Sequence, residues 1–386
     1  MPARQIVHQS RMNSNGFPFD QGSEFHLIEN IRKGEPSKSP WDRDGLFFGT
    51  GRDAIKAVLS LGIASRGWKR LWVPGYFCQT VVRSILETGI KVQCYRSWRP
   101  GEQKRNNGPS TVRGDVVLIV NYFGLNSEID LWSGARDSVA IIEDHTHDPW
   151  SSWAFNSKVD YCIASLRKVL PVPDGAVLWS PQGCALPNQP VLLEEHQHAV
   201  RRKLEAMKLK GSYLRGEITN KSFFRSLAVS GEEGLCGRNV SAISPWSAER
   251  LAHYPVAEWR QARKRNHRSL CDLLSSLSWL SVLRAPLEDD FVPFSGVLIF
   301  NGPGRREYIR LGLIRANIYP TILWPLEEPV IDGIPDEDVE ASRRMLSIHC
   351  DMRYSSEDMV RVAETIQKVS QEFETLRSKG PPRETY

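Results

Sequence analysis

Residues 139–168 read VAIIEDHTHDPWSSWAFNSKVDYCIASLRK, and this stretch decides the fold of the chain. It contains two short, continuous apolar runs, residues 139–142 and residues 161–164. Runs of this kind are typical of strands that are buried on both faces of a parallel sheet. The first run ends just before Asp144, and Lys168 follows the second by a few residues. We therefore expect a carboxylate and an amine at the carboxyl ends of two successive strands.

The same pattern extends to both sides of this stretch. Continuous apolar runs recur at residues 71–73, 116–120 and 176–179, and residues 92–95 are expected to form another strand. Apolar side chains recur at helical spacing in residues 51–61 and 81–86. Strands that alternate with helices indicate a mostly parallel sheet with helices on both faces. The sequence therefore predicts the α/β fold class, with a mostly parallel sheet of roughly seven strands.

Three regions differ in composition, and the differences predict the domain organisation. Residues 1–45 are polar and rich in Gly, Pro and Ser, so we expect an irregular N-terminal arm. The alternating strands and helices occupy residues 46–245, the expected large domain. Residues 246–386 combine charge-rich helical stretches with an apolar run at residues 297–300. This combination predicts a smaller C-terminal α+β domain.

The composition is that of a globular protein without a membrane anchor. The chain has 386 residues, of which 41% are hydrophobic and 25% charged, and its net charge is +5. No apolar run is long enough to cross a bilayer, and the N-terminus lacks the apolar core of a signal peptide. The seven cysteines form no Cys-x-x-Cys pair, which argues against disulfides and zinc. We expect a soluble, cytoplasmic protein with reduced thiols and no membrane partner.

A basic cluster between Arg260 and Arg268 is open to two interpretations. It could form a nucleic-acid patch, or it could be the solvated face of a helix. No aromatic-interleaved stripe accompanies it, although nucleic-acid binding would favour one. We therefore expect a solvated helix face and no nucleic-acid partner.

A further polar motif, Thr50-Gly51-Arg52-Asp53, begins a predicted helix. Free backbone N–H groups and the helix dipole favour a phosphate at such a position. Ligands of open α/β sheets bind beyond the carboxyl ends of the strands, where Asp144, Ser165 and Lys168 are expected. Pyridoxal phosphate (PLP) needs this combination of groups. An amine forms a Schiff base with its aldehyde, a carboxylate keeps its ring nitrogen protonated, and an anion cradle holds its phosphate.

Six segments occur in an order that identifies a family resemblance. They are Gly22-Ser23-Glu24-Phe25, Thr50-Gly51-Arg52-Asp53-Ala54, Val73-Pro74-Gly75-Tyr76-Phe77-Cys78, Tyr122-Phe123-Gly124, Ile142-Glu143-Asp144-His145-Thr146-His147, and residues 160–168 with Pro171 and Asp174-Gly175. On these segments the chain resembles the DegT/DnrJ/StrS family of PLP-dependent sugar aminotransferases, over nearly its whole length. The resemblance implies the aspartate-aminotransferase fold, which is PLP-dependent transferase fold type I. It also implies a homodimer with active sites at the interface.

The resemblance assigns roles to individual residues. Lys168 would be the catalytic residue, as the Schiff-base lysine and proton shuttle, and Asp144 would pair with the pyridinium nitrogen. His147 would lie near the ring hydroxyl. Tyr76 or Phe77 would contact the ring, because Cys78 occupies the position at which the family often has a stacking aromatic residue. The phosphate would be held by Ser165 and by the amides of Gly51, Arg52 and Asp53, and Asn239 would reach the phosphate of a neighbouring subunit.

The implied activity is transfer of an amino group, with glutamate as the usual donor, to a keto-sugar or a related carbonyl in a biosynthetic pathway. The family usually has two glycines where this chain has only Gly175, and the spacing from Ser165 to Lys168 is shorter than in many of its sugar aminotransferases. Both departures indicate a divergent branch of the family. Other PLP chemistries of this fold stay open, namely lyase or dehydratase reactions and C–C bond formation, as does a non-catalytic PLP-binding regulator. Lys168 favours transamination, because the family's sugar dehydratases have histidine in its place.

A metal site is the remaining alternative. His145 and His147 are two residues apart, so both imidazoles would share one face of an extended strand. No third ligand is evident, and we expect a cofactor contact and no metal.

Overall fold

The computed structural model describes residues 19–22, 24–28, 38–96, 109–125, 139–284 and 291–378. Most of the predicted N-terminal arm lies outside these residues, as does Ser23 of the first family-like segment. Two described parts of the arm pack against later parts of the chain. Gln21 forms a backbone bridge with Ile318, and Trp41 is buried against Trp150 and Trp179.

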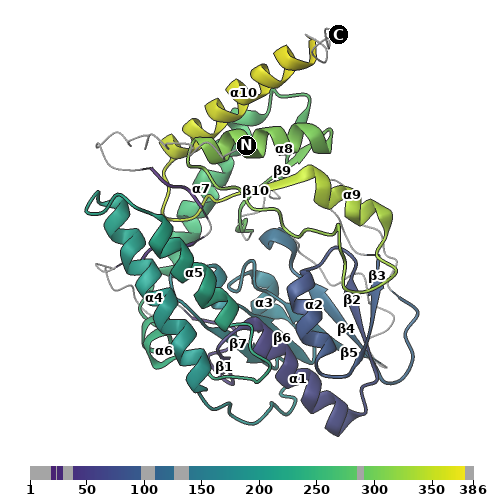
Figure 1. The fold of residues 1–386 in the computed structure, drawn as a ribbon. Coiled ribbons are helices and arrows are strands. Elements are labelled where there is room, and N and C mark those ends of the chain that lie inside the picture. The colour runs from purple at the N-terminus through teal and green to yellow at the C-terminus, as the bar shows by residue number, and fades with distance from the viewer. Residues whose placement is uncertain are drawn as a thin grey trace, which may run out of the picture.

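The larger of two sheets has seven strands, in the order β1-β7-β6-β5-β4-β2-β3 (Figure 1). These strands are β1 (Leu46–Phe48), β2 (Arg70–Pro74), β3 (Lys91–Tyr95), β4 (Asp115–Val120), β5 (Ala140–Asp144), β6 (Tyr161–Ala164) and β7 (Ala176–Trp179). The five strands from β6 to β3 are parallel, and β7 runs antiparallel to both of its neighbours. The predicted α/β class with a mostly parallel, seven-stranded sheet is confirmed.

Both faces of this sheet are buried, which explains the continuous apolar runs. Alternate residues of a strand point to opposite faces. On one face, Leu118 and Ile142 belong to a core shared with helices α1 (Gly51–Arg66) and α2 (Gln79–Leu86), which lie in front of the sheet in Figure 1. On the other face, Val117 and Ile141 belong to a core that includes Trp153 of helix α3 (Ser152–Asn156).

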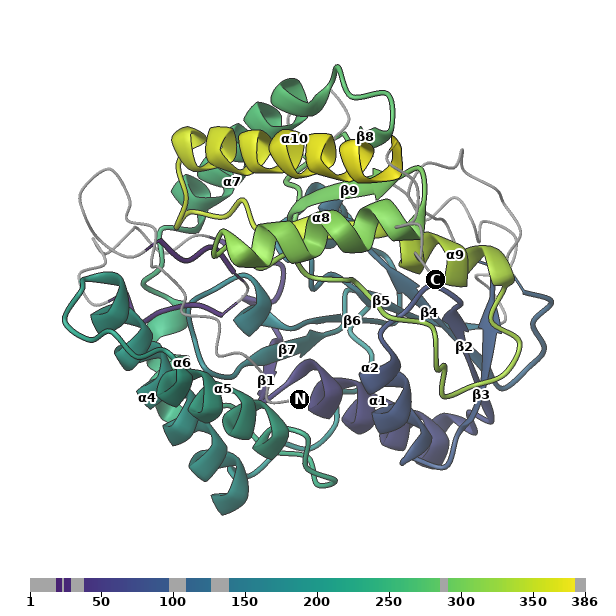
Figure 2. The ribbon, with the colours of Figure 1, turned by 45° about the horizontal axis from the view of Figure 1, so that its top comes forward.

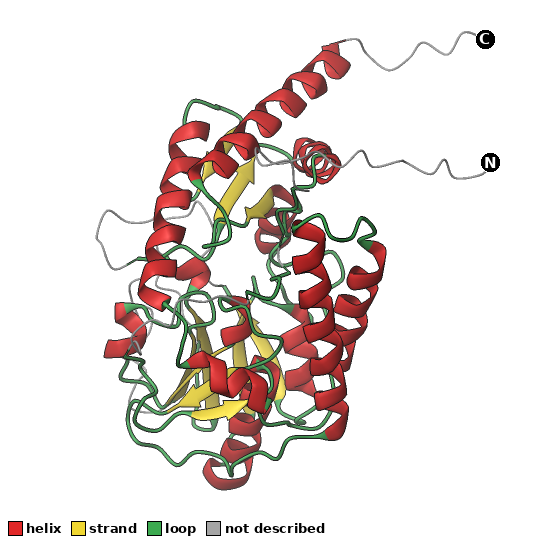
Figure 3. Cartoon of the chain, turned by 90° about the vertical axis from the view of Figure 1, so that its left-hand side faces the viewer, coloured by secondary structure: helices red, strands yellow, loops and turns green. Residues whose placement is uncertain are grey.

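The C-terminal part contains a second sheet of three antiparallel strands, in the order β10-β9-β8. Its elements are β8 (Leu280–Val282), β9 (Gly296–Phe300), β10 (Met345–Ile348) and helices α7 (Val256–Leu274), α8 (Pro303–Arg315), α9 (Asp336–Arg344) and α10 (Ser356–Ser378). Leu274 of α7, Leu313 of α8 and Ile366 of α10 share one core with this sheet. Figures 2 and 3 show the two sheets as separate layers of the molecule.

Helices α4 (Glu194–Leu214) and α5 (Ser222–Gly234) lie side by side next to β1 and β7 (Figures 1 and 2), and α6 (Pro245–Leu251) leads from them to α7. The predicted boundary between residues 245 and 246 lies at the start of α6. In the part of the chain that the structure describes, no helix combines the length and apolar character that a bilayer span requires.

A buried carboxylate, Asp174, joins the segment after Lys168 to two helices. Its oxygens accept hydrogen bonds from His196 Nε2 of α4 at 2.9 Å, from the Ser244 backbone N–H and hydroxyl at 2.7 Å each, and from the Ser247 hydroxyl. The side chain is fully buried. Because every donor is buried as well, losing the acceptor would leave several polar groups without partners.

We therefore expect Asp174→Ala to lower the free energy of unfolding by about 2–4 kcal/mol, the range for breaking a buried polar network. Urea denaturation measures this change. Asp332→Ala is the matched control, because Asp332 is exposed and its substitution is expected to cost less than about 0.5 kcal/mol. A loss below about 1 kcal/mol for Asp174→Ala would contradict the assignment of Asp174 as a structural anchor.

Candidate active site

A cavity of about 410 Å³ lies between the carboxyl ends of the parallel strands and the C-terminal part of the chain. Val120, Asp144 and Ile163 line it at the ends of β4, β5 and β6. From the opposite side it is lined by Phe294, residues 321–324 and the segment around Asp351. Its volume falls in the range of small-molecule sites, and its position is the one expected for the ligand of an open α/β sheet.

Lys168 ends a single 3-10 turn, Leu166–Lys168, that follows β6 directly. Its side chain is exposed to the cavity instead of being packed in the core. The positive charge of the neighbouring Arg167 and the surrounding protein lower the pKa of the Lys168 amine from 10.5 to about 8. A larger fraction of the amine is therefore unprotonated near neutral pH than in an ordinary lysine, as a nucleophilic amine requires.

Asp144 is the last residue of β5 and is partly buried at the cavity. Its Oδ1 accepts a hydrogen bond from the Thr146 backbone N–H at 2.9 Å, and Thr146 Oγ1 accepts one from the Ser165 N–H at 3.0 Å. These two bonds connect the ends of β5 and β6. Burial raises the pKa of Asp144, so its ionised form gains from a cationic partner in the cavity.

The N-terminus of α1 reaches the same cavity. Thr50 caps the helix, because its Oγ1 accepts a hydrogen bond from the Asp53 N–H at 3.2 Å. A Cβ on Gly51 would lie 3.2 Å from the Ser165 Cβ, so the glycine permits the close approach of these two segments. Gly51, Arg52 and Ser165 line the cavity, whereas Asp53 is buried behind it with its amide bonded to the cap. Of the groups predicted to hold a phosphate, the first two residues of α1 and Ser165 line the cavity, and Asp53 does not.

His147 is held in a fixed orientation against the cavity. Its Nδ1 accepts a hydrogen bond from the Phe123 backbone N–H at 2.9 Å, and its ring stacks on Phe294 with 4.4 Å between ring centroids. Phe123 has a φ of 56°, an unfavourable value for a bulky residue, and this conformation accompanies the bond to His147. Burial lowers the pKa of His147 to about 3. The ring is therefore neutral near pH 7, and because Nδ1 accepts, its proton is on Nε2.

A cluster of charged side chains lies beside the α1 terminus. Arg167 makes two bonds to the Glu232 carboxylate, at 2.7 and 2.8 Å, and Lys203 binds the same carboxylate at 2.9 Å. Arg52 lies 3.7 Å from it. Arg167 and Lys203 hold the pKa of Glu232 far below its usual range. Lys203 also lies 3.6 Å from the Glu24 carboxylate, so three cations share two carboxylates and one positive charge is left to balance an anion.

The two histidines of the metal alternative are separated in the structure. His145 is fully buried, bonds Glu143 through Nε2 at 2.9 Å, and lies against Trp153. His147 instead stacks with Phe294 at the cavity. The idea that they share one face is wrong, because the strand ends at Asp144 and the chain turns after it. Glu143, His145 and Cys162 do come together, but the Glu143 carboxylate already accepts bonds from Trp153 and Ser157.

Phe77 and Asn239 were also predicted to belong to the site, and only Phe77 lies at the cavity. Phe77 lines the cavity and is buried edge-on against Trp324, with 5.8 Å between ring centroids. Asn239 is exposed and lies outside the cavity of the single chain. Its loop is anchored to α1, because Lys56 Nζ donates to the carbonyls of Gly237 and Arg238 at 2.9 and 2.8 Å.

Several cavity residues were not anticipated from the sequence. They are Arg263, Phe294, Trp324, His349, Asp351 and Arg353, all from the C-terminal part. The prediction that the Arg260–Arg268 cluster is a solvated helix face is wrong for Arg263, which is only 6% exposed. A signal for its burial existed in the sequence. Arg263 precedes Leu270 and Leu274 by 7 and 11 residues, the spacing of one helix face.

The donor set fits a phosphate-bearing aromatic aldehyde such as PLP. An amine with a lowered pKa, a partly buried carboxylate and a helix N-terminus with a hydroxyl all face one cavity. The neutral His147 can donate through Nε2 to a ring oxygen. Surplus positive charge beside Arg52 suits a phosphate.

The lowered pKa of Lys168 can be measured by its reactivity. An amine reacts with acetic anhydride only when unprotonated, so labelling reaches half of its maximum at the pKa. With protein freed of bound aldehyde by hydroxylamine, trace labelling and peptide mapping are expected to give a midpoint near pH 8 for Lys168. Exposed lysines are expected to give midpoints near their usual value of about 10.4.

Two variants test the cause of this shift. Arg167→Gln removes the largest lowering influence and is expected to raise the midpoint, whereas Glu232→Gln removes a raising influence and is expected to lower it. A midpoint for Lys168 above pH 10 in the unaltered protein, or shifts of the same sign in both variants, would contradict this electrostatic account.

Comparison with known proteins supports the architecture. Neither a protein-family model nor a curated protein matches the sequence. Similar solved structures include DesV of S. venezuelae in complex with a ketimine intermediate, with a TM-score of 0.57, 15% identity and 84% of each chain covered. DesI with its TDP-sugar product has a TM-score of 0.56 and 14% identity over 87% of this chain and 83% of its own. The PLP form of Spr1654, a putative sugar aminotransferase of Streptococcus pneumoniae, has a TM-score of 0.56 and 14% identity over 85% of this chain and 87% of its own. The chain therefore has the fold of these aminotransferases, PLP-dependent fold type I, as the sequence predicts.

Proposed function

We propose that the protein is a PLP-dependent aminotransferase that transfers an amino group from glutamate to a keto-sugar or a related carbonyl in a biosynthetic pathway. The observation that carries the proposal is the convergence of Lys168, Asp144 and the N-terminus of α1 on one cavity. Support also comes from the fold, which is shared with sugar aminotransferases. When bound, PLP supplies an aldehyde for the Schiff base and a ring that accepts electrons.

Lys168 has two tasks in this proposal. Its amine attaches the cofactor, and once released it moves a proton between the substrate carbon and the cofactor. Its pKa of about 8 suits both tasks, because the amine can accept a proton and lose it again near neutral pH. The preceding Ser165 and the amides of Gly51 and Arg52 hold the phosphate, which fixes the cofactor relative to Lys168.

Asp144 and His147 orient and polarise the ring. The Asp144 carboxylate accepts a hydrogen bond from the protonated ring nitrogen, and burial makes this pairing favourable for both partners. His147 donates from Nε2 to the ring oxygen while Nδ1 stays bonded to Phe123. Because the His147 pKa is about 3, this donor does not change its protonation state between pH 5 and pH 9.

We further propose a homodimer in the cytoplasm. Support for the dimer comes from the anchored, exposed loop that carries Asn239, since this loop is available to a second chain. Closed two-fold symmetry is also the commonest arrangement of soluble oligomers. Asn239 would then contribute to the phosphate site of the neighbouring subunit.

The absorbance spectrum of the purified protein tests the proposed function. We expect a cofactor band above about 320 nm that moves to shorter wavelength when L-glutamate is added, because the amino group passes to the cofactor. A protein that binds no PLP after incubation with it, or a band that no amino donor changes, would overturn the proposal.

Asp144→Asn tests the role of the carboxylate in the same assay. The variant is expected to keep the cofactor band but to lose at least about 100- to 1,000-fold in the rate of the glutamate-dependent change, because an amide does not hold a proton on the ring nitrogen. Asp332→Asn, at an exposed position outside the cavity, is the control. An unchanged rate in Asp144→Asn would exclude Asp144 as the partner of the ring nitrogen.

A further inference from the structure

A second, smaller cavity adjoins the candidate active site, and we call it the side cavity. It has a volume of about 150 Å³ and is lined by residues of the N-terminal segment, by helices α4 and α5, and by Tyr319. Glu24, Phe25 and Met207 line both cavities. These three residues therefore form the wall between them, and a ligand at Lys168 that extends past this wall enters the side cavity.

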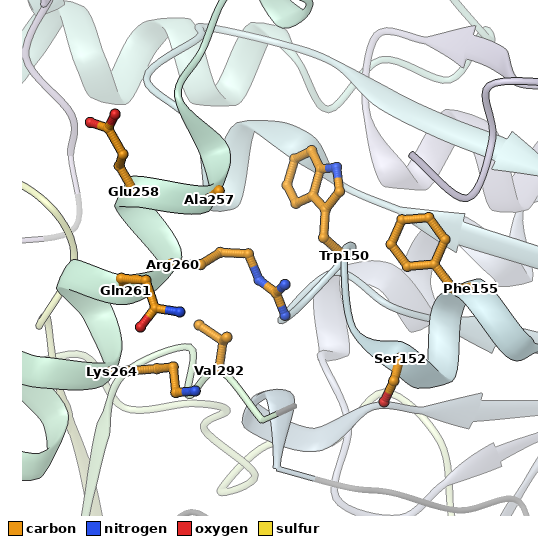
Figure 4. A pocket seen from close by; sticks show the side chains of 9 residues that line it. All are labelled: Trp150, Ser152, Phe155, Ala257, Glu258, Arg260, Gln261, Lys264 and Val292. Carbon is orange, nitrogen blue, oxygen red and sulfur yellow. The ribbon is translucent and has the colours of Figure 1, made fainter. Parts of the chain in front are cut away.

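A larger hollow elsewhere in the molecule lacks this connection. It has a volume of about 500 Å³, lies between α3 and α7, and is lined by Trp150, Arg260 and Lys264 among others (Figure 4). Its Arg260 is bonded to Asp148 at 2.8 Å. Among the described residues, none lines both this hollow and the candidate active site. The side cavity is therefore the better candidate for a part of the substrate site.

Apolar side chains contribute much of the surface of the side cavity. Phe25, Ala206, Met207 and Phe224 are each at most 8% exposed, and Ala228 of α5 lies beside them. An apolar cavity of about 150 Å³ is large enough to bind benzene. The side cavity can therefore hold one six-membered ring in contact with these side chains.

The charged groups at the side cavity are already engaged. Lys210 Nζ lies 3.1 Å from the Asp20 carboxylate and donates to the Glu24 carbonyl at 2.8 Å. Arg225 lies over the Tyr319 ring, with 5.6 Å from its guanidinium carbon to the ring centroid, and is exposed, so water solvates its charge. None of these groups needs a charged ligand as its partner, and the side cavity favours a neutral one.

One part of the shared wall is fixed, and another part can adjust. The Arg353 guanidinium lies over the Phe25 ring at 4.1 Å and donates to the Glu24 carbonyl at 2.7 Å. These contacts hold the N-terminal part of the wall in place. Methionine side chains have three rotatable bonds and adapt to irregular gaps. Met207 is therefore the part of the wall that a ligand can displace.

The shared wall lies near the amine of Lys168. Both Lys168 and Glu24 line the candidate active site. Burial alone would raise the pKa of Glu24, but the positive charges of Lys203, Lys210 and Lys168 lower it. Glu24 is thus within electrostatic range of Lys168, and a substituent on a carbonyl held at Lys168 can extend to the wall.

We propose that the side cavity is a subsite for an uncharged aromatic ring on the amino acceptor. The inference rests on the proposed function and deepens it, because it names a substituent of the acceptor. Burying such a ring against apolar side chains is favourable, and aromatic rings also gain from contact with the rings of Phe25 and Phe224 and with the sulfur of Met207. The subsite selects among carbonyl compounds by the group that is attached to the carbonyl.

Two ketones that differ only by a phenyl group test this subsite. The PLP-loaded protein is converted to its aminated form with L-glutamate, freed of glutamate, and mixed with butan-2-one or 4-phenylbutan-2-one. The return of the cofactor band gives kcat/KM for each ketone. We expect kcat/KM to be at least about 30-fold higher for the phenyl compound, since a single methylene in an apolar pocket already changes specificity by about 10- to 200-fold.

Variants of α5 test whether the preference arises in the side cavity. Ala228→Phe fills the cavity and is expected to lower the ratio of the two kcat/KM values at least about 10-fold. Ala228→Leu is a smaller filling and is expected to lower the ratio less. Val229→Phe is the matched control, because Val229 is the next residue of α5, is 58% exposed and does not line the cavity. A ratio near 1 in the unaltered protein, or an unchanged ratio in both Ala228 variants, would overturn the inference.

The failure of this inference can be distinguished from that of the proposed function. A cofactor band that glutamate does not move would contradict the proposed function. Calorimetric titration with benzyl alcohol tests the side cavity by itself, because it needs no amino transfer. We expect equal affinity in the unaltered protein and Val229→Phe, and at least about 10-fold weaker affinity in Ala228→Phe. No binding to the unaltered protein, or undiminished affinity in Ala228→Phe, would overturn the role of the side cavity alone.

Discussion

The parallel direction of β4, β5 and β6 is the constraint on which the candidate site depends. Parallel strands bring their carboxyl ends to one edge of the sheet, so residues that follow different strands meet there. Asp144 is the last residue of β5 and Lys168 follows β6, although they are 24 positions apart in the chain. The bonds from Thr146 to Asp144 and from Ser165 to Thr146 then fix the two strand ends to each other. If the sheet were antiparallel at this point, the carboxylate and the amine would lie at opposite edges.

Charge is the second organising feature of the cavity. Arg52, Arg167 and Lys203 gather around Glu232, and Lys203 also lies 3.6 Å from Glu24. The Arg263 Nε has no hydrogen bond among the described residues. Among the described residues, the cluster around Glu232 has one more cation than carboxylates. A cofactor phosphate would balance this surplus charge. Arg167 and Lys203 of this cluster also lower the pKa of Lys168.

The sequence predicted those parts of the fold that depend on local pattern. Five strands of the large sheet were visible as continuous apolar runs because both faces of the sheet are buried, and β3 was expected as a further strand. β1 and β8 have only three residues each, and they were missed. β10, with four buried residues, was missed as well. Such short segments give little periodic signal. The partner of β1 is also far away in the chain, at β7.

The residues of the candidate site also divide into those that a local sequence pattern could indicate and those that it could not. Lys168, Asp144 and His147 follow strands that could be recognised, and the structure places all three at the cavity. Arg263 was hidden in a run of basic residues, although the spacing to Leu270 marks its face of the helix. Phe294 and Trp324 belong to irregular segments whose contact with the large sheet no local pattern could indicate. The separation of His145 from His147 also required the structure, because it follows from a turn after Asp144.

The central claim is that Lys168 attaches the cofactor, and one measurement tests it most directly. The purified, PLP-loaded protein is reduced with borohydride, digested and mapped by mass spectrometry. The account predicts a stable pyridoxyl group on Lys168, and its absence in Lys168→Ala treated in the same way. A pyridoxyl group on a different lysine of the unaltered protein, or none although PLP is demonstrably bound, would contradict the account.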